Sequence, residues 1–168
     1  MPKGLKQTSS LVSIGFEVTE SGANTFTQGT TDLNLDPLNR EVFVVMAIDM
    51  DPTPPDMVPG SNTATGCSIT TTSQTAVQNL SNANCLAVGA LNIRSSGATA
   101  VSFQRSADES PASLLDYLGI IATNDFHVQV EGTLNATGKK VSGKLYGFRS
   151  TASADICAAL VQSEVLSA

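Results

Sequence analysis

The chain has 168 residues and a net charge of −6, and 14% of its residues are charged, against about 25% in an average globular protein. This length suits one domain with a hydrophobic core and is too short for two ordinary domains. Serine and threonine supply 37 residues, so we expect a polar but weakly charged surface. Such a surface repels other copies of the chain weakly and permits close self-packing.

The basic residues exclude one class of partner. The nine lysines and arginines are scattered, and Lys139-Lys140 is their longest run. Binding along nucleic acid needs many cations to displace counterions, so we exclude a nucleic-acid-binding role. The N-terminal residues lack the apolar core of a signal peptide, and no apolar run approaches the ~20 residues that span a bilayer. We therefore expect synthesis in a cytoplasm, no cleaved export signal and no membrane partner.

Period-two alternation predicts a half-buried strand over Leu11–Thr19. The polar segment Ser21–Asn39 is predicted to be a long loop, with a short edge strand near Thr25–Thr27. Glu41–Ile48 is apolar on both faces, which predicts a central strand buried on both sides. Four prolines interrupt Asp49–Gly60, so that segment is predicted to be an extended loop.

The middle of the chain is predicted to alternate short strands with polar turns. Gln74–Asn84 is Asn- and Ser-rich, with one helical turn near Ala76–Leu80. Ser110 and Pro111 are suited to the N-cap and first turn of a short helix that ends at Tyr117. The expected strands are 67–73, Cys85–Ile93, Thr99–Gln104 and Gly119–Ala122, with a hairpin turn at Arg94–Ala98.

The clearest hairpin pairs the alternating segment Phe126–Glu131 with Lys140–Arg149. Two glycines, Gly143 and Gly147, lie on one face of the return strand, which indicates a bend or the close approach of another backbone. The C-terminus is left open: Ser153 caps a helix over 155–161, or residues 159–166 form a final strand.

About eight short strands, polar loops and one or two short helices predict an all-β chain. Without βαβ periodicity, the expected fold is a single antiparallel β-sandwich or jelly-roll-like domain over residues 11–168, preceded by an N-terminal arm over residues 1–10. The predicted core contains Val42, Val44, Val45, Ile48, Phe126, Val128 and Val130.

The cysteines are Cys67, Cys85 and Cys157. Without a CxxC motif, neither a zinc site nor a thioredoxin-type redox pair is expected. A Cys67–Cys85 disulfide stays open, although three small buried apolar residues are the favoured interpretation.

His127 is the single histidine, and in its predicted strand it shares a face with Asp125 and Gln129. A catalytic triad also needs a nucleophile, and the chain has no G-x-S-x-G elbow. We therefore expect His127 to be an exposed surface residue. No catalytic residue, phosphate-binding motif or cofactor site is predicted.

The acidic segment Asp49, Asp51 and Asp56 could supply oxygen ligands to calcium, but its spacing lacks the glycine and the bidentate glutamate of an EF-hand. A turn after a buried strand is the favoured interpretation, and we predict no metal site. The other carboxylates form no obvious catalytic pair; they are Glu17, Glu20, Asp32, Asp36, Glu41, Asp108, Glu109, Asp116, Glu131, Asp155 and Glu164.

Two segments carry a family resemblance. Ile120–Gly132 followed by Lys140–Arg149 resembles the C-terminal hairpin of small virion structural proteins of marine viruses and phages, and Val42–Ile48 and Cys85–Ala87 are similar in character. The resemblance covers about half the chain. It implies a capsid shell or capsid-decorating subunit with a β-sandwich fold and no catalytic residues.

We therefore expect a non-enzymatic virion protein, made in the host cytoplasm, that forms a homo-oligomer and contacts other capsid proteins. Deleting residues 1–10 is expected to weaken assembly more than folding. The alternative is a receptor- or glycan-binding module of a viral tail or fibre, which would bind its ligand as a monomer.

Overall fold

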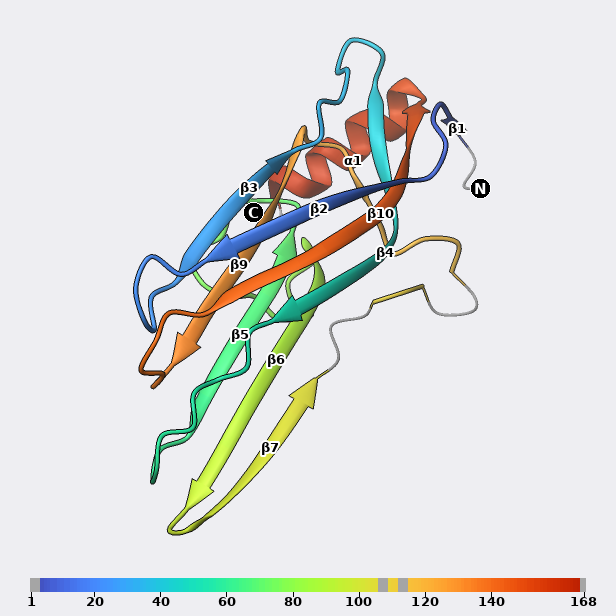
Figure 1. Ribbon diagram of the computed structural model, residues 1–168. Helices are drawn as coiled ribbons and strands as arrows, with labels where there is room; N and C mark the ends of the chain where they lie inside the picture. The colour runs from blue at the N-terminus through green and yellow to red at the C-terminus, as the bar shows by residue number, and fades with distance from the viewer. Residues whose placement is uncertain (1–3, 106–108, 112–114, 167–168) are drawn as a thin grey trace.

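The computed structural model describes residues 4–105, 109–111 and 115–166. These residues form an antiparallel β-sandwich with one C-terminal helix (Figure 1). The strands are β1 (Leu5–Gln7), β2 (Val12–Thr19), β3 (Thr27–Asp32), β4 (Glu41–Pro52), β5 (Thr63–Thr70), β6 (Cys85–Ser96), β7 (Thr99–Arg105), β8 (Gly119–Ile121), β9 (Asp125–Thr133) and β10 (Lys140–Ala152), and the helix is α1 (Ala154–Leu166).

The strands form two antiparallel sheets. In the first sheet, β1 and β2 lie end to end along one edge of β10, followed by β4 and then β8. The second sheet has the order β3-β9-β5-β6-β7. We call them the β10 sheet and the β9 sheet. The predicted fold class is confirmed.

The core lies between the two sheets. Phe16 on β2 meets Phe126 on β9 edge to face, with ring centroids 6.1 Å apart, a favourable geometry for two aromatic rings. Each residue of the predicted core is buried; the set is Val42, Val44, Val45, Ile48, Phe126, Val128 and Val130.

β4 is buried on both sides, as predicted, because each side has its own cover. Phe43 and Val45 face the core between the sheets. Val42 and Val44 belong to a second cluster on the outer face, where α1 contributes Ile156. The ambiguous C-terminus therefore forms the helix, not the strand, and this helix covers the outer face of β4 around Val42 and Val44.

The outer face of the β9 sheet is covered in a different way, by the polar segment 71–84. Gln129 on β9 is fully buried; its amide donates to Thr70 and Gln28, and its carbonyl oxygen accepts from Ser68. The Ser68 hydroxyl in turn accepts from the backbone N–H of Gln78. The segment contains no helical turn, contrary to the prediction, because side-chain bonds to the sheet satisfy its backbone instead.

The two glycines on one face of β10 are explained by close packing. A Cβ at Gly147 would collide with the Val44 carbonyl oxygen and the Phe43 ring, and a Cβ at Gly143 would collide with the Asp49 carbonyl oxygen and the Phe16 ring. The prediction of close backbone approach is confirmed.

The predicted hairpin of Phe126–Glu131 with Lys140–Arg149 was wrong. β9 and β10 lie in different sheets, since β9 pairs with β3 and β5, whereas β10 pairs with β1, β2 and β4. Alternation along each strand does not reveal which strand is its partner.

Some predicted boundaries were also wrong. Residues 49–52 continue β4, because Asp51 still pairs with Ser142 and only the later prolines end the ladder. β3 lies within the expected long loop, as Thr27–Asp32 pairs with β9. The expected helix over 111–117 includes residues outside the described part, and its described residues 111 and 115–117 are not helical. No helix in the described residues is long and apolar enough to cross a membrane.

Candidate assembly surface

The β6–β7 hairpin extends to the end of the molecule that lies farthest from α1 (Figure 1). Its two-residue turn is Gly97-Ala98, since Ser96 pairs with Thr99. Gly97 has φ +61°, and a glycine at the first central position of a hairpin turn gives the twist that antiparallel strands need. β6 extends past its neighbour, because β5 pairs with β6 only as far as Ile93. The hairpin tip therefore projects beyond the rest of its sheet.

All seven residues of β7 are exposed. β7 is the last strand of the β9 sheet and, within the described residues, pairs only with β6. Val101 and Phe103 are 54% and 56% exposed. They lie on one face, with Arg94 of β6 opposite Val101. The strand thus combines an open backbone edge with an exposed apolar face.

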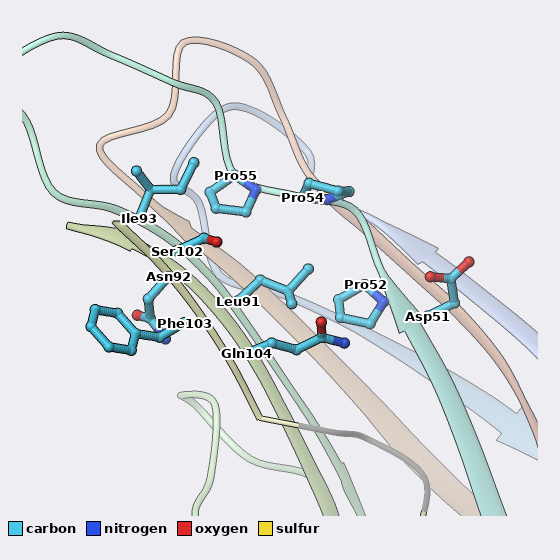
Figure 2. A pocket seen from close by; sticks show the side chains of 10 residues that line it. All are labelled: Asp51, Pro52, Pro54, Pro55, Leu91, Asn92, Ile93, Ser102, Phe103 and Gln104. Carbon is cyan, nitrogen blue, oxygen red and sulfur yellow. The ribbon is translucent and has the colours of Figure 1, made fainter. Parts of the chain in front are cut away.

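A groove of about 340 Å³ runs along the other face of the hairpin. Leu91 and Ile93 of β6 point across it toward the proline segment Pro52–Pro55 (Figure 2). Phe103 also borders the groove, although alternation along β7 places its side chain on the same face as Val101. On this edge of β4, β8 pairs only over Phe43–Val45, and Glu109 forms a further antiparallel bridge with Ile48. The described residues leave the edge open beyond Ile48, where the groove lies.

The calcium hypothesis for Asp49, Asp51 and Asp56 is not supported by their positions. Asp49 and Asp51 lie on β4, opposite Lys144 and Ser142 of β10. Asp56 lies in the β4–β5 loop and pairs with Lys139. Within the described chain, no three His, Cys, Asp or Glu side chains are placed to share a metal ion.

Asp56 instead joins two loops. Its Oδ1 lies 2.5 Å from the buried Lys139 Nζ, and its Oδ2 accepts from the backbone N–H groups of Ala136 and Thr137 and from the Thr137 hydroxyl. The bonds from Lys139 first, and then those from Thr137, lower the pKa of Asp56 to about 2, because each one favours the charged carboxylate.

Glu20 extends this cluster at the end of β2. Its carboxylate accepts from the backbone N–H groups of Thr25, Gly132 and Lys139. Asn135 links the same loops, accepting from the N–H of Asp56 and donating to the Ala64 carbonyl. The cluster joins the loops that follow β2, β4 and β9 at one end of the sandwich. We assign it a structural role.

His127 is buried, so the prediction of an exposed side chain was wrong. Its Nδ1 lies 3.0 Å from the Thr30 hydroxyl and its Nε2 lies 3.8 Å from Asp125 Oδ1. The neighbouring Gln129 is buried on the same face. The face was misjudged because polar residues alone did not reveal that the segment 71–84 covers it.

The three cysteines are free. The strand register places Cys67 opposite Gly89 and Cys85 opposite Thr70, which separates the two along the β5–β6 ladder. Burial raises the pKa of Cys67 to about 12 and that of Cys85 to about 11, so neither thiol is activated as a nucleophile. Cys157 lies on α1 and packs against the cluster of Val42 and Val44. Only Cys67 is fully buried, whereas Cys85 and Cys157 are half-buried.

Glu164 is the one buried acidic residue of α1. Its carboxylate accepts from the backbone N–H groups of Ala122 and Thr123, just after β8, and its pKa is raised, mainly because burial disfavours the charge. The Asn84 amide donates to its backbone carbonyl. Glu164 therefore fixes the end of the helix to both sheets.

No protein-family model matches this chain, and no curated protein matches it. Among solved structures, the chain is similar to one titled Desmodium yellow mottle tymovirus, at 11% sequence identity and a TM-score of 0.30. That similarity covers 91% of this chain and 94% of the other.

The sequence revealed the hairpin but not its exposure. Cys85–Ile93, Thr99–Gln104 and the turn between them were predicted close to their observed positions. The alternation of Val101 and Phe103 with Ser102 is typical of a half-buried strand. The exposed fractions of Val101 and Phe103, and not the pattern, show that nothing in the described chain covers this apolar face.

Proposed function

We propose that this chain is a non-enzymatic structural subunit of a virion, which builds or decorates a protein shell through contacts with copies of itself and with other shell proteins. One observation carries the proposal: β7 is an edge strand whose seven residues are all exposed, and two of them, Val101 and Phe103, are large and apolar.

An open edge of this kind favours association. Its row of N–H and C=O groups can template pairing with another strand, and monomeric proteins usually protect such edges with charges, prolines, bulges or covering loops. β7 has no proline and only one charged residue, Arg105. The exposed apolar side chains next to the edge would gain free energy by burial.

The rest of the molecule supports a role as a building block. Two-sheet antiparallel sandwiches are a common architecture of capsid subunits, although a fold alone does not define a function. The low content of charged side chains, 14%, permits close subunit packing. In a closed symmetric shell each weak contact is repeated, so modest subunit contacts add up to a stable assembly.

The test is the mass of the purified protein in solution, by light scattering across a wide range of concentrations, with electron microscopy of the largest species. We expect the mass to rise with concentration toward closed particles. The double variant Val101→Ser, Phe103→Ser should stay monomeric with an unchanged melting temperature. The matched control is Leu80→Ser, since Leu80 is 54% exposed like Val101 but lies on the segment over the β9 sheet; it should assemble like the wild type.

A concentration-independent monomer would contradict the proposal and favour the alternative of a binding module. The groove between Leu91, Ile93 and the proline segment would then be the place to look for a ligand, because its volume of about 340 Å³ lies within the range of small-molecule pockets. Glycan binding by the monomer would be the next measurement.

A further inference from the structure

We propose that two copies of this chain join β7 to β7 in antiparallel register across a two-fold axis at Ser102, which makes one continuous sheet of ten strands from two β9 sheets. This inference rests on the proposed function, because it names the contact through which copies associate. It starts from a requirement of chemistry: a row of alternating backbone donors and acceptors is satisfied in full only by another extended strand.

The register follows from the strand itself. A two-fold axis perpendicular to the sheet pairs residues that lie on the same face, so the pairing must be centred on a residue. β7 spans residues 99–105, and Ser102 is its midpoint. Centring on Ser102 is therefore the register that pairs all seven residues; centring on Val101 or Phe103 leaves two of them unpaired.

The side chains suit this register. Each Val101 would face the Phe103 of the other copy, and the two pairs would form one apolar cluster on the outer face. Directly opposed aromatic and β-branched side chains are among the favourable cross-strand pairs. Ala100 would face Gln104 on the groove side, where a small residue opposite a long one fits without a clash.

Charge also favours this contact. The chain is acidic overall, at −6, so most surfaces of two copies repel each other. Residues 85–105 contain two arginines, Arg94 and Arg105, and no acidic residue, so the hairpin is a part of the surface without acidic repulsion. In this register Arg105 faces Thr99 and lies six residues, roughly 20 Å, from its own symmetry mate. That separation exceeds the Debye length of about 8 Å at physiological salt, and Arg105 also lies 3.7 Å from Glu109.

Disulfide trapping tests the register. In a background with Cys85→Ser and Cys157→Ser, which leaves only the buried Cys67, Ser102→Cys is expected to form a disulfide-linked dimer under mild oxidation, because a residue on the axis faces itself at Cα separations that a disulfide spans. Ala100→Cys and Gln104→Cys are matched controls on the same face. Each alone should cross-link several-fold less than Ser102→Cys, whereas a mixture of the two should yield the mixed dimer.

Light scattering on the same background, without the added cysteine, separates the possible failures. If the protein associates but Ala100→Cys cross-links as readily as Ser102→Cys, or Ser102→Cys does not cross-link, the β7–β7 contact is overturned and the proposed function stands. If the protein is monomeric at every concentration, both proposals are overturned. Selective trapping at Ser102, with the mixed dimer from the controls, is the result expected.

Discussion

The two long sides of the sandwich differ sharply, although both end in an edge strand of the β9 sheet. On the closed side, β3 lies beside β2 of the other sheet, and the Val18 side chain occupies the space over Gly29. On the open side, β7 has no counterpart in the described part of the β10 sheet, because β8 pairs only with Phe43–Val45 of β4 and Glu109 only with Ile48. Strands of the chain itself close one side, and the other side is open in the described residues.

The difference teaches that two edge strands of one sheet need not have the same role. β3 is rich in threonine, but most of its residues are partly covered, and its backbone edge is adjacent to β2. β7 has a similar length and a more apolar face, yet every residue is exposed. Stability is therefore expected to depend on the closed side, and association on the open side.

The largest expected difference is between two Phe→Ala substitutions, one of a buried ring and one of an exposed ring. Phe126→Ala removes a fully buried ring that bridges the sheets, and should lower the free energy of unfolding by about 3–5 kcal/mol. Phe103→Ala removes an exposed ring and should change it by less than about 0.5 kcal/mol. Denaturant unfolding at low protein concentration measures both; similar losses would mean that the hairpin packs against the body in solution.

The glycines of β10 give a second, smaller effect. Gly147→Ala forces a Cβ against the Val44 carbonyl oxygen and the Phe43 ring, and should cost about 1–3 kcal/mol through overpacking. Gly15→Ala is the matched control on the neighbouring strand, since the nearest atom to its Cβ is 4.0 Å away. An equal loss in both variants would contradict the packing explanation.

The cluster around Asp56 and Lys139 predicts how the stability of the fold depends on pH. Because the folded-state pKa of Asp56, about 2, lies below its ordinary value of 3.8, its contribution to stability is present above about pH 4 and is lost as the pH falls toward 2. Asp56→Asn should therefore lower the melting temperature at pH 6 but change it little at pH 2.

A double-mutant cycle that combines Asp56→Asn with Lys139→Met isolates the Asp56–Lys139 ion pair. If Asp56 acts mainly through Lys139, the two substitutions should be clearly non-additive at pH 6, and the coupling should fade toward pH 2. Additive effects at both pH values would assign the stabilisation to the Thr137 and Ala136 bonds instead.

Much of this architecture could be predicted from local pattern, and the failures have physical causes. Alternation located β2, β9 and β10, and an apolar run on both faces of Glu41–Ile48 identified the central strand. Coverage of an outer face depends on distant segments, which is why the burial of His127 and Gln129 was missed. For the converse reason the sequence made no prediction of the exposure of Val101 and Phe103, since a half-apolar strand gives the same pattern whether or not another segment covers it.

The most direct test of the open side is hydrogen–deuterium exchange of the backbone amides, followed as the protein concentration rises. We expect the β7 amides that face away from β6 to exchange fast in dilute solution and to become protected as the mass increases, while the amides of β3 keep the same protection throughout. Association without any added protection in β7 would contradict the claim that this edge joins the subunits.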